Sequence, residues 1–131
     1  MNRRTQLSVA ASLALTALFA SPPVAAQAPA SLETGFLNGQ VTASGTTMRY
    51  VVYVPWDYSP EKQWPVILFM HGSGEEGTDG LRQVVGGLAQ QILWNSKRFP
   101  CLVVLPQTNG GTWNCAAGDL ALQALDDVVA K

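Results

Sequence analysis

The sequence predicts an α/β fold with a mostly parallel sheet flanked by helices, and three observations lead to this prediction. Residues 66–70 (Val-Ile-Leu-Phe-Met) and 101–105 (Cys-Leu-Val-Val-Leu) are two fully apolar runs. Short runs of this kind are typical of strands buried on both faces of a parallel sheet. Between them, residues 81–93 repeat apolar side chains at helical spacing, as expected for the crossover that joins parallel strands.

Length and composition limit the class of protein. The chain has 131 residues, which allows one domain or part of one. It is 47% apolar and 13% charged, against ~25% charged residues in typical domains, so it is too apolar to be disordered. The formal net charge is −1 and the basic residues are scattered. Nothing in this pattern favours binding to nucleic acid.

The chain begins with the pattern of a secretory signal peptide. Residues 2–4 are basic, residues 7–20 are uncharged and apolar, and residues 21–26 supply a helix breaker followed by small side chains. The apolar stretch is shorter than the ~20 residues that a membrane span needs. We expect cleavage after Ala26, with Ala28 as the alternative, and no membrane span afterwards. The mature protein would be secreted or periplasmic, and the two arginines leave twin-arginine export open as a route.

Two strands are predicted before the first apolar run. Residues 35–41 form the first, which ends at the turn signal Ser44-Gly45. Residues 48–54 are β-branched and aromatic and stop at Pro55, which predicts the second strand. With the runs described above, the expected order is β-β-β-α-β-α.

A final helix is expected after a loop over residues 107–118. Asp119 is the predicted cap of this helix. Its inner face is formed by apolar residues at helical spacing, Ala121, Leu122, Leu125, Val128 and Val129. In the preceding helix, Gly86-Gly87 costs roughly 1 kcal/mol per glycine, which close packing against the sheet would explain.

Three or four strands with two helices leave an apolar sheet edge uncovered. We therefore expect residues 27–131 to be the N-terminal part of a larger, incomplete domain that follows a signal peptide over residues 1–26.

The candidate site is the loop that follows the third strand. Residues 71–75 (His-Gly-Ser-Gly-Glu) place a histidine and a glycine-rich turn at the carboxyl end of a buried strand. Ligands bind at that end in open α/β sheets. Glycines there allow backbone N–H groups to face an incoming oxygen without obstruction by side chains.

Three segments together resemble the α/β-hydrolase superfamily. They are Tyr-Val-Val-Tyr-Val-Pro at 50–55, Trp-Pro-Val-Ile-Leu-Phe-Met-His-Gly-Ser-Gly-Glu at 64–75, and Phe-Pro-Cys-Leu-Val-Val-Leu-Pro-Gln at 99–107. The nearest types are secreted esterases like the feruloyl esterases, polyhydroxybutyrate depolymerases and phospholipase/carboxylesterases. The resemblance covers about residues 48–131 and implies the N-terminal half of an α/β-hydrolase fold.

The resemblance assigns roles to the loop residues. The backbone N–H groups of Ser73 and Gly74 are implied donors of an oxyanion hole, although Ser73 could instead be an ordinary turn residue. His71, Gly72 and Glu75 are implied supports of that loop. Trp113 follows the fourth strand and is expected to line the substrate pocket, with plain packing as the alternative.

No catalytic triad can be assembled from these residues. The family uses a serine in a Gly-x-Ser-x-Gly elbow, then an acid, then a histidine. Ser73 is flanked at the required positions by His71 and Glu75 instead of glycines, and His71 is the only histidine. The resemblance therefore implies an exported serine hydrolase of carboxylic esters, without a cofactor, of which this chain supplies the oxyanion-loop half.

Other functions remain open at this point. A prolyl-oligopeptidase-like serine peptidase shares this N-terminal half, and a non-catalytic secreted binding module is the reading from another class. The substrate would be a small-molecule or polymeric ester whose acyl and alcohol groups the sequence does not specify.

Two residue sets have rival interpretations. His71 could act as a general base, or it could join Glu75, Glu76 and Asp79 in a metal cluster, although one histidine with loop acids is weak support for a metal site.

Cys101 and Cys115 would meet an oxidising compartment after export. They are candidates for a disulfide worth ~3 kcal/mol, provided that their Cα atoms approach within ~7 Å. The alternatives are a buried free Cys101 or pairing with cysteines beyond residue 131.

Overall fold

A computed structural model describes residues 32–131. The predicted signal peptide and its cleavage sites lie outside the described residues. Within residues 32–131, no helix is long and apolar enough to cross a membrane.

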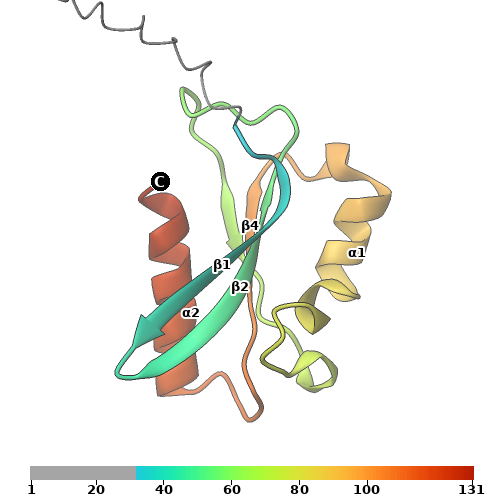
Figure 1. The fold of residues 1–131 in the computed structure, drawn as a ribbon. Coiled ribbons are helices and arrows are strands. Elements are labelled where there is room, and N and C mark those ends of the chain that lie inside the picture. Colours follow the sequence, from blue (N-terminus) through green and yellow to red (C-terminus); the bar gives the residue numbers. More distant parts are fainter. Residues whose placement is uncertain (1–31) are drawn as a thin grey trace, which may run out of the picture. The chain divides into compact units, whose positions relative to one another are not determined.

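The described chain forms one four-stranded sheet with the order β1-β2-β4-β3 (Figure 1). The strands are β1 (Gly35–Ala43), β2 (Thr46–Val54), β3 (Val66–Leu68) and β4 (Leu102–Pro106). β3 and β4 are parallel, whereas β1 pairs with β2 and β2 pairs with β4 in antiparallel fashion. The α/β class and element order are confirmed, but the described sheet is mixed, not mostly parallel.

The antiparallel pairing of β1 and β2 follows from their turn. Ala43 faces Thr46 in the register, so only Ser44 and Gly45 connect the strands. Both residues have a positive φ, 49° and 78°, which is the backbone twist that two-residue hairpins favour.

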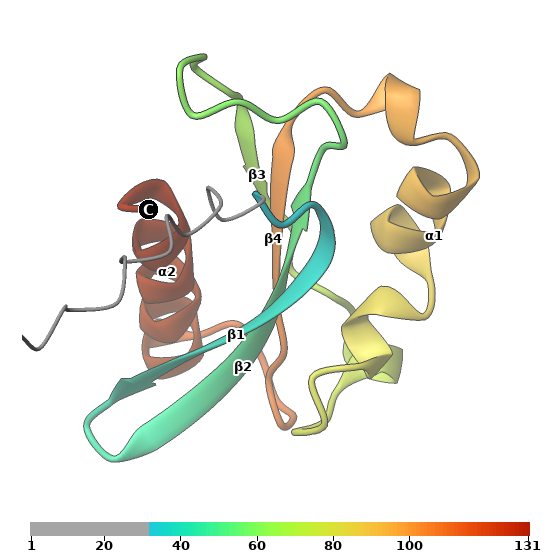
Figure 2. The ribbon, with the colours of Figure 1, turned by 45° about the horizontal axis from the view of Figure 1, so that its top comes forward.

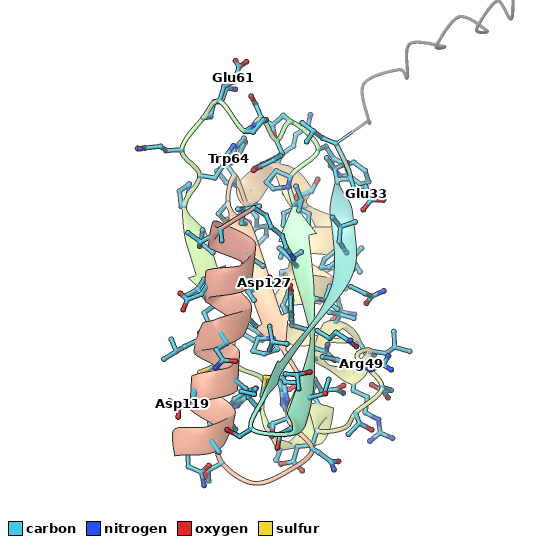
Figure 3. The ribbon with its side chains drawn as sticks, turned by 60° about the vertical axis from the view of Figure 1, so that its left-hand side comes forward. Glu33, Arg49, Glu61, Trp64, Asp119 and Asp127 are labelled. Atoms are coloured by element: carbon cyan, nitrogen blue, oxygen red, sulfur yellow. The ribbon has the colours of Figure 1, made fainter. Side chains whose placement is uncertain are left out.

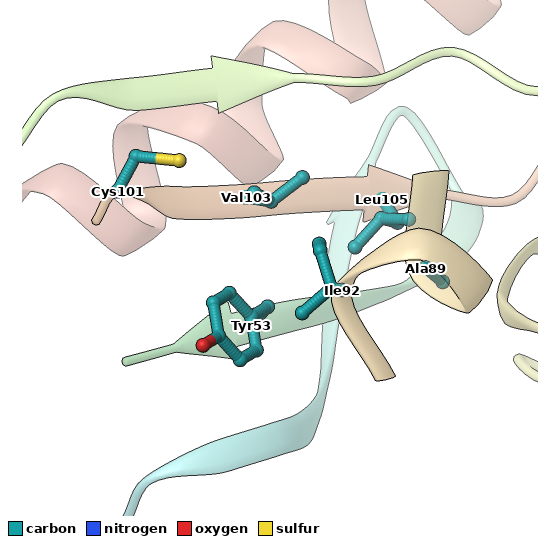
Figure 4. Packing of buried hydrophobic residues seen from close by; sticks show 6 residues of the cluster. All are labelled: Tyr53, Ala89, Ile92, Cys101, Val103 and Leu105. Carbon is teal, nitrogen blue, oxygen red and sulfur yellow. The ribbon is translucent and has the colours of Figure 1, made fainter. Parts of the chain in front are cut away.

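The helices α1 (Gly87–Trp94) and α2 (Cys115–Val129) cover opposite faces of the sheet (Figures 1 and 2). On one face, Tyr53, Val103 and Leu105 pack against Ala89 and Ile92 of α1 (Figure 4). Successive side chains of a strand point to opposite faces. The intervening Val104 therefore packs on the other face.

The core on the α2 side joins β2, β4 and α2. Tyr50, Val104 and Ala124 are fully or almost fully buried there, beside a second group that contains Met48 and Ala121. β4 is thus buried on both faces, as its apolar run predicts.

The prediction for β3 is wrong in two respects. The strand covers only Val66–Leu68 instead of residues 66–70, and it is not buried on both faces. Ile67 is 39% and Met70 38% exposed. The reason is that β3 is the last strand of the described sheet and has a neighbour on one side only.

The predicted helix over residues 81–93 is interrupted. A 3-10 turn, η2 (Arg82–Val84), precedes α1, which begins at Gly87. Gly87 has a φ of +54° and cannot continue a right-handed helix. A Cβ atom there would lie 3.4 Å from the Phe69 ring, so this glycine also permits close packing.

The cap predicted for the last helix is also wrong. α2 begins at Cys115, and Asn114 occupies the N-cap position with an extended backbone. Asp119 lies inside α2 as an exposed residue (Figure 3). Asn114 makes no side-chain capping hydrogen bond, so side-chain capping does not fix the start of α2, and the sequence pattern gave no signal for Cys115.

Candidate functional site

The candidate site is built on the loop that leaves the carboxyl end of β3. Its histidine, His71, is 5% exposed and is held by hydrogen bonds at both ring nitrogens. Nε2 accepts the backbone N–H of Thr108 at 3.1 Å, and Nδ1 lies 2.7 Å from the carbonyl oxygen of Gly72. Because a backbone N–H can only donate, the ring proton lies on Nδ1 and is donated to Gly72. Neither nitrogen is left to act as a general base.

Trp113 supports His71 directly. Its indole Nε1–H donates to the carbonyl oxygen of His71 at 2.9 Å, and the two rings meet edge to face with centroids 4.9 Å apart. Trp113 also packs against the buried group that contains Met48 and Leu120. These contacts support the alternative that Trp113 is a packing residue, while its role in the substrate pocket stays a prediction.

Gly72 and Glu75 close the next turn by a reciprocal pair of hydrogen bonds. The Glu75 side chain accepts the Gly72 N–H at 2.8 Å, and the Gly72 carbonyl accepts the Glu75 N–H at 3.2 Å. The enclosed segment is the 3-10 turn η1 (Ser73–Glu75). The structure thus brings together the five loop residues that the sequence predicts as one unit.

The backbone N–H groups of Ser73 and Gly74 have no hydrogen-bond acceptor among the described residues. The reason is their position at the start of η1, where N–H groups lack partners inside the helix. Both residues are exposed, and a Cβ atom added at Gly74 would meet nothing within 4 Å. Ser73 borders an open groove of about 430 Å³ that also touches Gly77 and Asn109. Two free donors therefore lie open at the carboxyl edge of the sheet.

Sequence reasoning missed the residues that fasten this loop, Gln107 and Thr108. The buried Gln107 side chain accepts the Gly80 N–H at 2.6 Å and donates to the Glu75 carbonyl at 3.3 Å. The Thr108 carbonyl accepts the Gly77 N–H at 2.9 Å. A signal was present, because these polar residues directly follow the apolar run of β4, beside the carboxyl end of β3.

Asp79 closes the loop on its far side. One carboxylate oxygen accepts the N–H groups of Leu81 and Arg82 and a hydrogen bond from Gln107 at 2.9 Å. These bonds, that of Leu81 foremost, hold the pKa of Asp79 below its usual range. Arg82 adds an exposed ion pair at 3.6 Å.

The rival metal site receives no support. Among residues 32–131, no group of three or more His, Cys, Asp or Glu side chains is arranged to hold a metal ion. Both nitrogens of His71 also have partners within the protein, as described above.

Cys101 is a buried free thiol at the start of β4 (Figure 4). Of the alternatives that the sequence left open, the buried free Cys101 is the one that the structure shows, so Cys101 forms no disulfide with Cys115. Cys115 begins α2, beyond the other end of β4, so the strand separates the two residues. Burial raises the pKa of the Cys101 thiol, as expected for an inert core cysteine.

Comparison with known proteins agrees with this geometry at the level of the fold. No family model matches the chain. The structure is similar to one titled "Crystal Structure of a Thermostable Esterase", with a TM-score of 0.57 and 25% identity over 72% of this chain. The chain is also 32% identical over 90 residues, 67% of its length, to Endo-1,4-beta-xylanase Y of Acetivibrio thermocellus.

Both matches are partial with respect to the other protein. The chain spans 30% of the esterase and 8% of the xylanase. The structural likeness to the esterase indicates that the described residues have an α/β-hydrolase-like fold, similar to part of that protein.

Proposed function

We propose that the protein is an exported serine hydrolase of carboxylic esters and that this chain supplies one side of its oxyanion hole. The observation that supports the proposal most directly is the pair of unpaired N–H groups at Ser73 and Gly74. They lie on a fastened loop at the carboxyl end of β3. The likeness to part of an esterase supports the same reaction class.

The chemistry assigned to the loop is stabilisation of negative charge. A nucleophile outside residues 32–131 would attack the ester carbonyl, and its oxygen would become an oxyanion. One N–H donor aimed at such an oxygen is worth roughly 3 kcal/mol in the barrier. Since both nitrogens of His71 are engaged, we assign the base to another residue and give His71 the role of orienting the loop.

We further propose that residues 27–131 are the N-terminal part of an α/β-hydrolase domain. The exposed edge of β3 and the partial coverage of the esterase support this. The likeness to a xylanase makes esterified xylan the first polymeric substrate to try beside small esters.

The test compares residues 27–131 with the protein expressed from its complete reading frame. We expect the complete protein to hydrolyse a short-chain nitrophenyl ester and to lose that activity to a serine-reactive phosphonate. Residues 27–131 alone should stay at the buffer background, because an oxyanion hole without a nucleophile leaves the attack to water. Phosphonate-sensitive turnover by residues 27–131 would place a nucleophile within them and overturn the proposed division of roles.

Hydrolysis of peptides in place of esters by the complete protein would instead favour the serine peptidase. Export is tested separately by N-terminal sequencing of the protein from a secreting host, where we expect Gln27 as the first residue; an intact Met1 in the exported fraction would contradict export.

A further inference from the structure

We infer that Gln107 is the positioning residue of the oxyanion loop: its side-chain amide ties residues 75–80 to the end of β4 and so fixes the turn that presents the Ser73 and Gly74 N–H groups. The catalytic consequence of this inference rests on the proposed function, whereas the structural part does not.

The amide of Gln107 lies between the two sides of the loop. Nε2 donates to the Glu75 carbonyl at 3.3 Å and to an Asp79 carboxylate oxygen at 2.9 Å, while Oε1 accepts the Gly80 N–H at 2.6 Å. Glu75 is the last residue of η1, and Gly80 directly precedes the segment that leads to α1. One side chain therefore joins both ends of the segment.

The partners determine which residue can do this. A carbonyl and a carboxylate only accept, and a backbone N–H only donates, so the site needs two donors and an acceptor on one planar group. Gly77 provides the room, since a Cβ atom at that position would lie 2.9 Å from Nε2 of Gln107. The surrounding backbone is therefore matched to an amide of this length.

Gln107 is itself anchored on the sheet. Its backbone N–H donates to the Arg49 carbonyl at 2.9 Å, which extends the β2–β4 pairing by one residue. The Gln107 side chain therefore holds the loop from a backbone position that is hydrogen-bonded to the sheet.

Burial alone does not produce these contacts, as a second glutamine shows. Gln83 of η2 is 1% exposed, compared with 3% for Gln107. Neither its Nε2 nor its Oε1 has a partner among the described residues. Gln83 is therefore a matched control, with the same side chain and burial but without the hydrogen bonds to the loop.

The test uses Gln107→Met and Gln83→Met in the protein expressed from its complete reading frame. Methionine keeps the length and most of the volume of glutamine and removes its hydrogen bonds. Amide hydrogen exchange at Gly80, whose N–H loses its acceptor, should become about 10-fold faster in Gln107→Met, the scale of one lost hydrogen bond, and stay unchanged in Gln83→Met. In ester hydrolysis, Gln107→Met should lower kcat about 10-fold with little change in KM, and Gln83→Met should not.

The variant Gln107→Asn covers the case in which Gln107→Met fails to fold. It keeps the amide on a side chain that is one methylene shorter, so the amide no longer reaches the Gly80 N–H and exchange at Gly80 should again be faster than in wild type. Unchanged exchange in both Gln107 variants, or equal acceleration in Gln83→Met, would overturn the inference. Faster exchange in a protein that hydrolyses no ester would retain Gln107 as the residue that positions the loop and overturn the proposed function.

Discussion

At the scale of single residues, the loop shows which site features a sequence can reveal. His71, Gly72, Ser73, Gly74 and Glu75 are consecutive, so their grouping needed no knowledge of the fold. Whether His71 is a base or a support depends on Thr108, which lies 37 positions further along the chain. That contact exists only because β3 and β4 are neighbours. The loop residues were therefore predictable from the sequence, whereas the hydrogen bonds that Gln107 and Thr108 make to them were not.

Two substitutions at Ser73 distinguish a role of its backbone N–H from a role of its hydroxyl. In the complete protein, Ser73→Ala should retain most activity, because the N–H remains. Ser73→Pro removes the N–H and should lower kcat on the order of 10²-fold. Proline is compatible with the local backbone, since Gly72 before it is extended at φ −87° and ψ −179°. Rates are measured on a nitrophenyl ester, with circular dichroism as the folding control.

Equal loss in the alanine and proline variants would contradict the backbone assignment and point to the hydroxyl of Ser73.

At the scale of elements, the patterns predict strands better than helix boundaries. β2 and β4 fall within one or two residues of the prediction, because β-branched and apolar runs match their burial. The helices differ because their starts depend on single backbone conformations. Gly87 has a left-handed φ, and Asn114 takes the cap position expected for Asp119. Hydrophobic periodicity indicates neither the left-handed φ of Gly87 nor the position of Asn114 at the start of α2.

The pairing of β1 with β2 makes a prediction about Gly39. Gly39 faces Tyr50 across the strands, and a Cβ atom at Gly39 would overlap the Tyr50 ring. The Tyr50 hydroxyl donates to Asp127 of α2, which also binds Lys131 at 2.7 Å. Gly39→Ala should displace the ring and lower the free energy of unfolding by about 1–3 kcal/mol.

Gly118→Ala is the matched control for Gly39→Ala. Gly118 lies inside α2, and a Cβ atom there would be at an ordinary 3.6 Å from the Trp113 carbonyl oxygen. This variant should raise the free energy of unfolding by about 0.5–1 kcal/mol. Urea unfolding of the complete protein measures both, and a Gly39→Ala variant as stable as wild type would show that the ring moves without cost.

At the scale of the whole molecule, the described sheet has an exposed edge at β3, where Ile67 is 39% exposed. An apolar edge strand recruits other strands, whereas a charge on it prevents pairing. Residues 27–131 alone should therefore self-associate, and Ile67→Lys should shift them towards monomer in sedimentation velocity. Leu93→Lys is the control on α1, because Leu93 is more exposed at 67% but not on a strand.

If a further strand covers β3 in the complete protein, Ile67→Lys should lower its Tm. A Leu93→Lys variant that suppresses association as strongly as Ile67→Lys would locate the sticky surface on the helix instead.

The hydrogen bonds that hold the loop come from the segment after β4, so they cannot form until that segment has been synthesised. The ribosome releases the loop before Gln107 and Thr108, which bind residues 32 and 37 positions earlier in the chain. At ~5–20 residues per second, this interval is on the order of seconds. Throughout it, the Gly77 and Gly80 N–H groups have neither of their later acceptors. The loop after β3 therefore cannot take its final shape until β4 has emerged and paired beside β3.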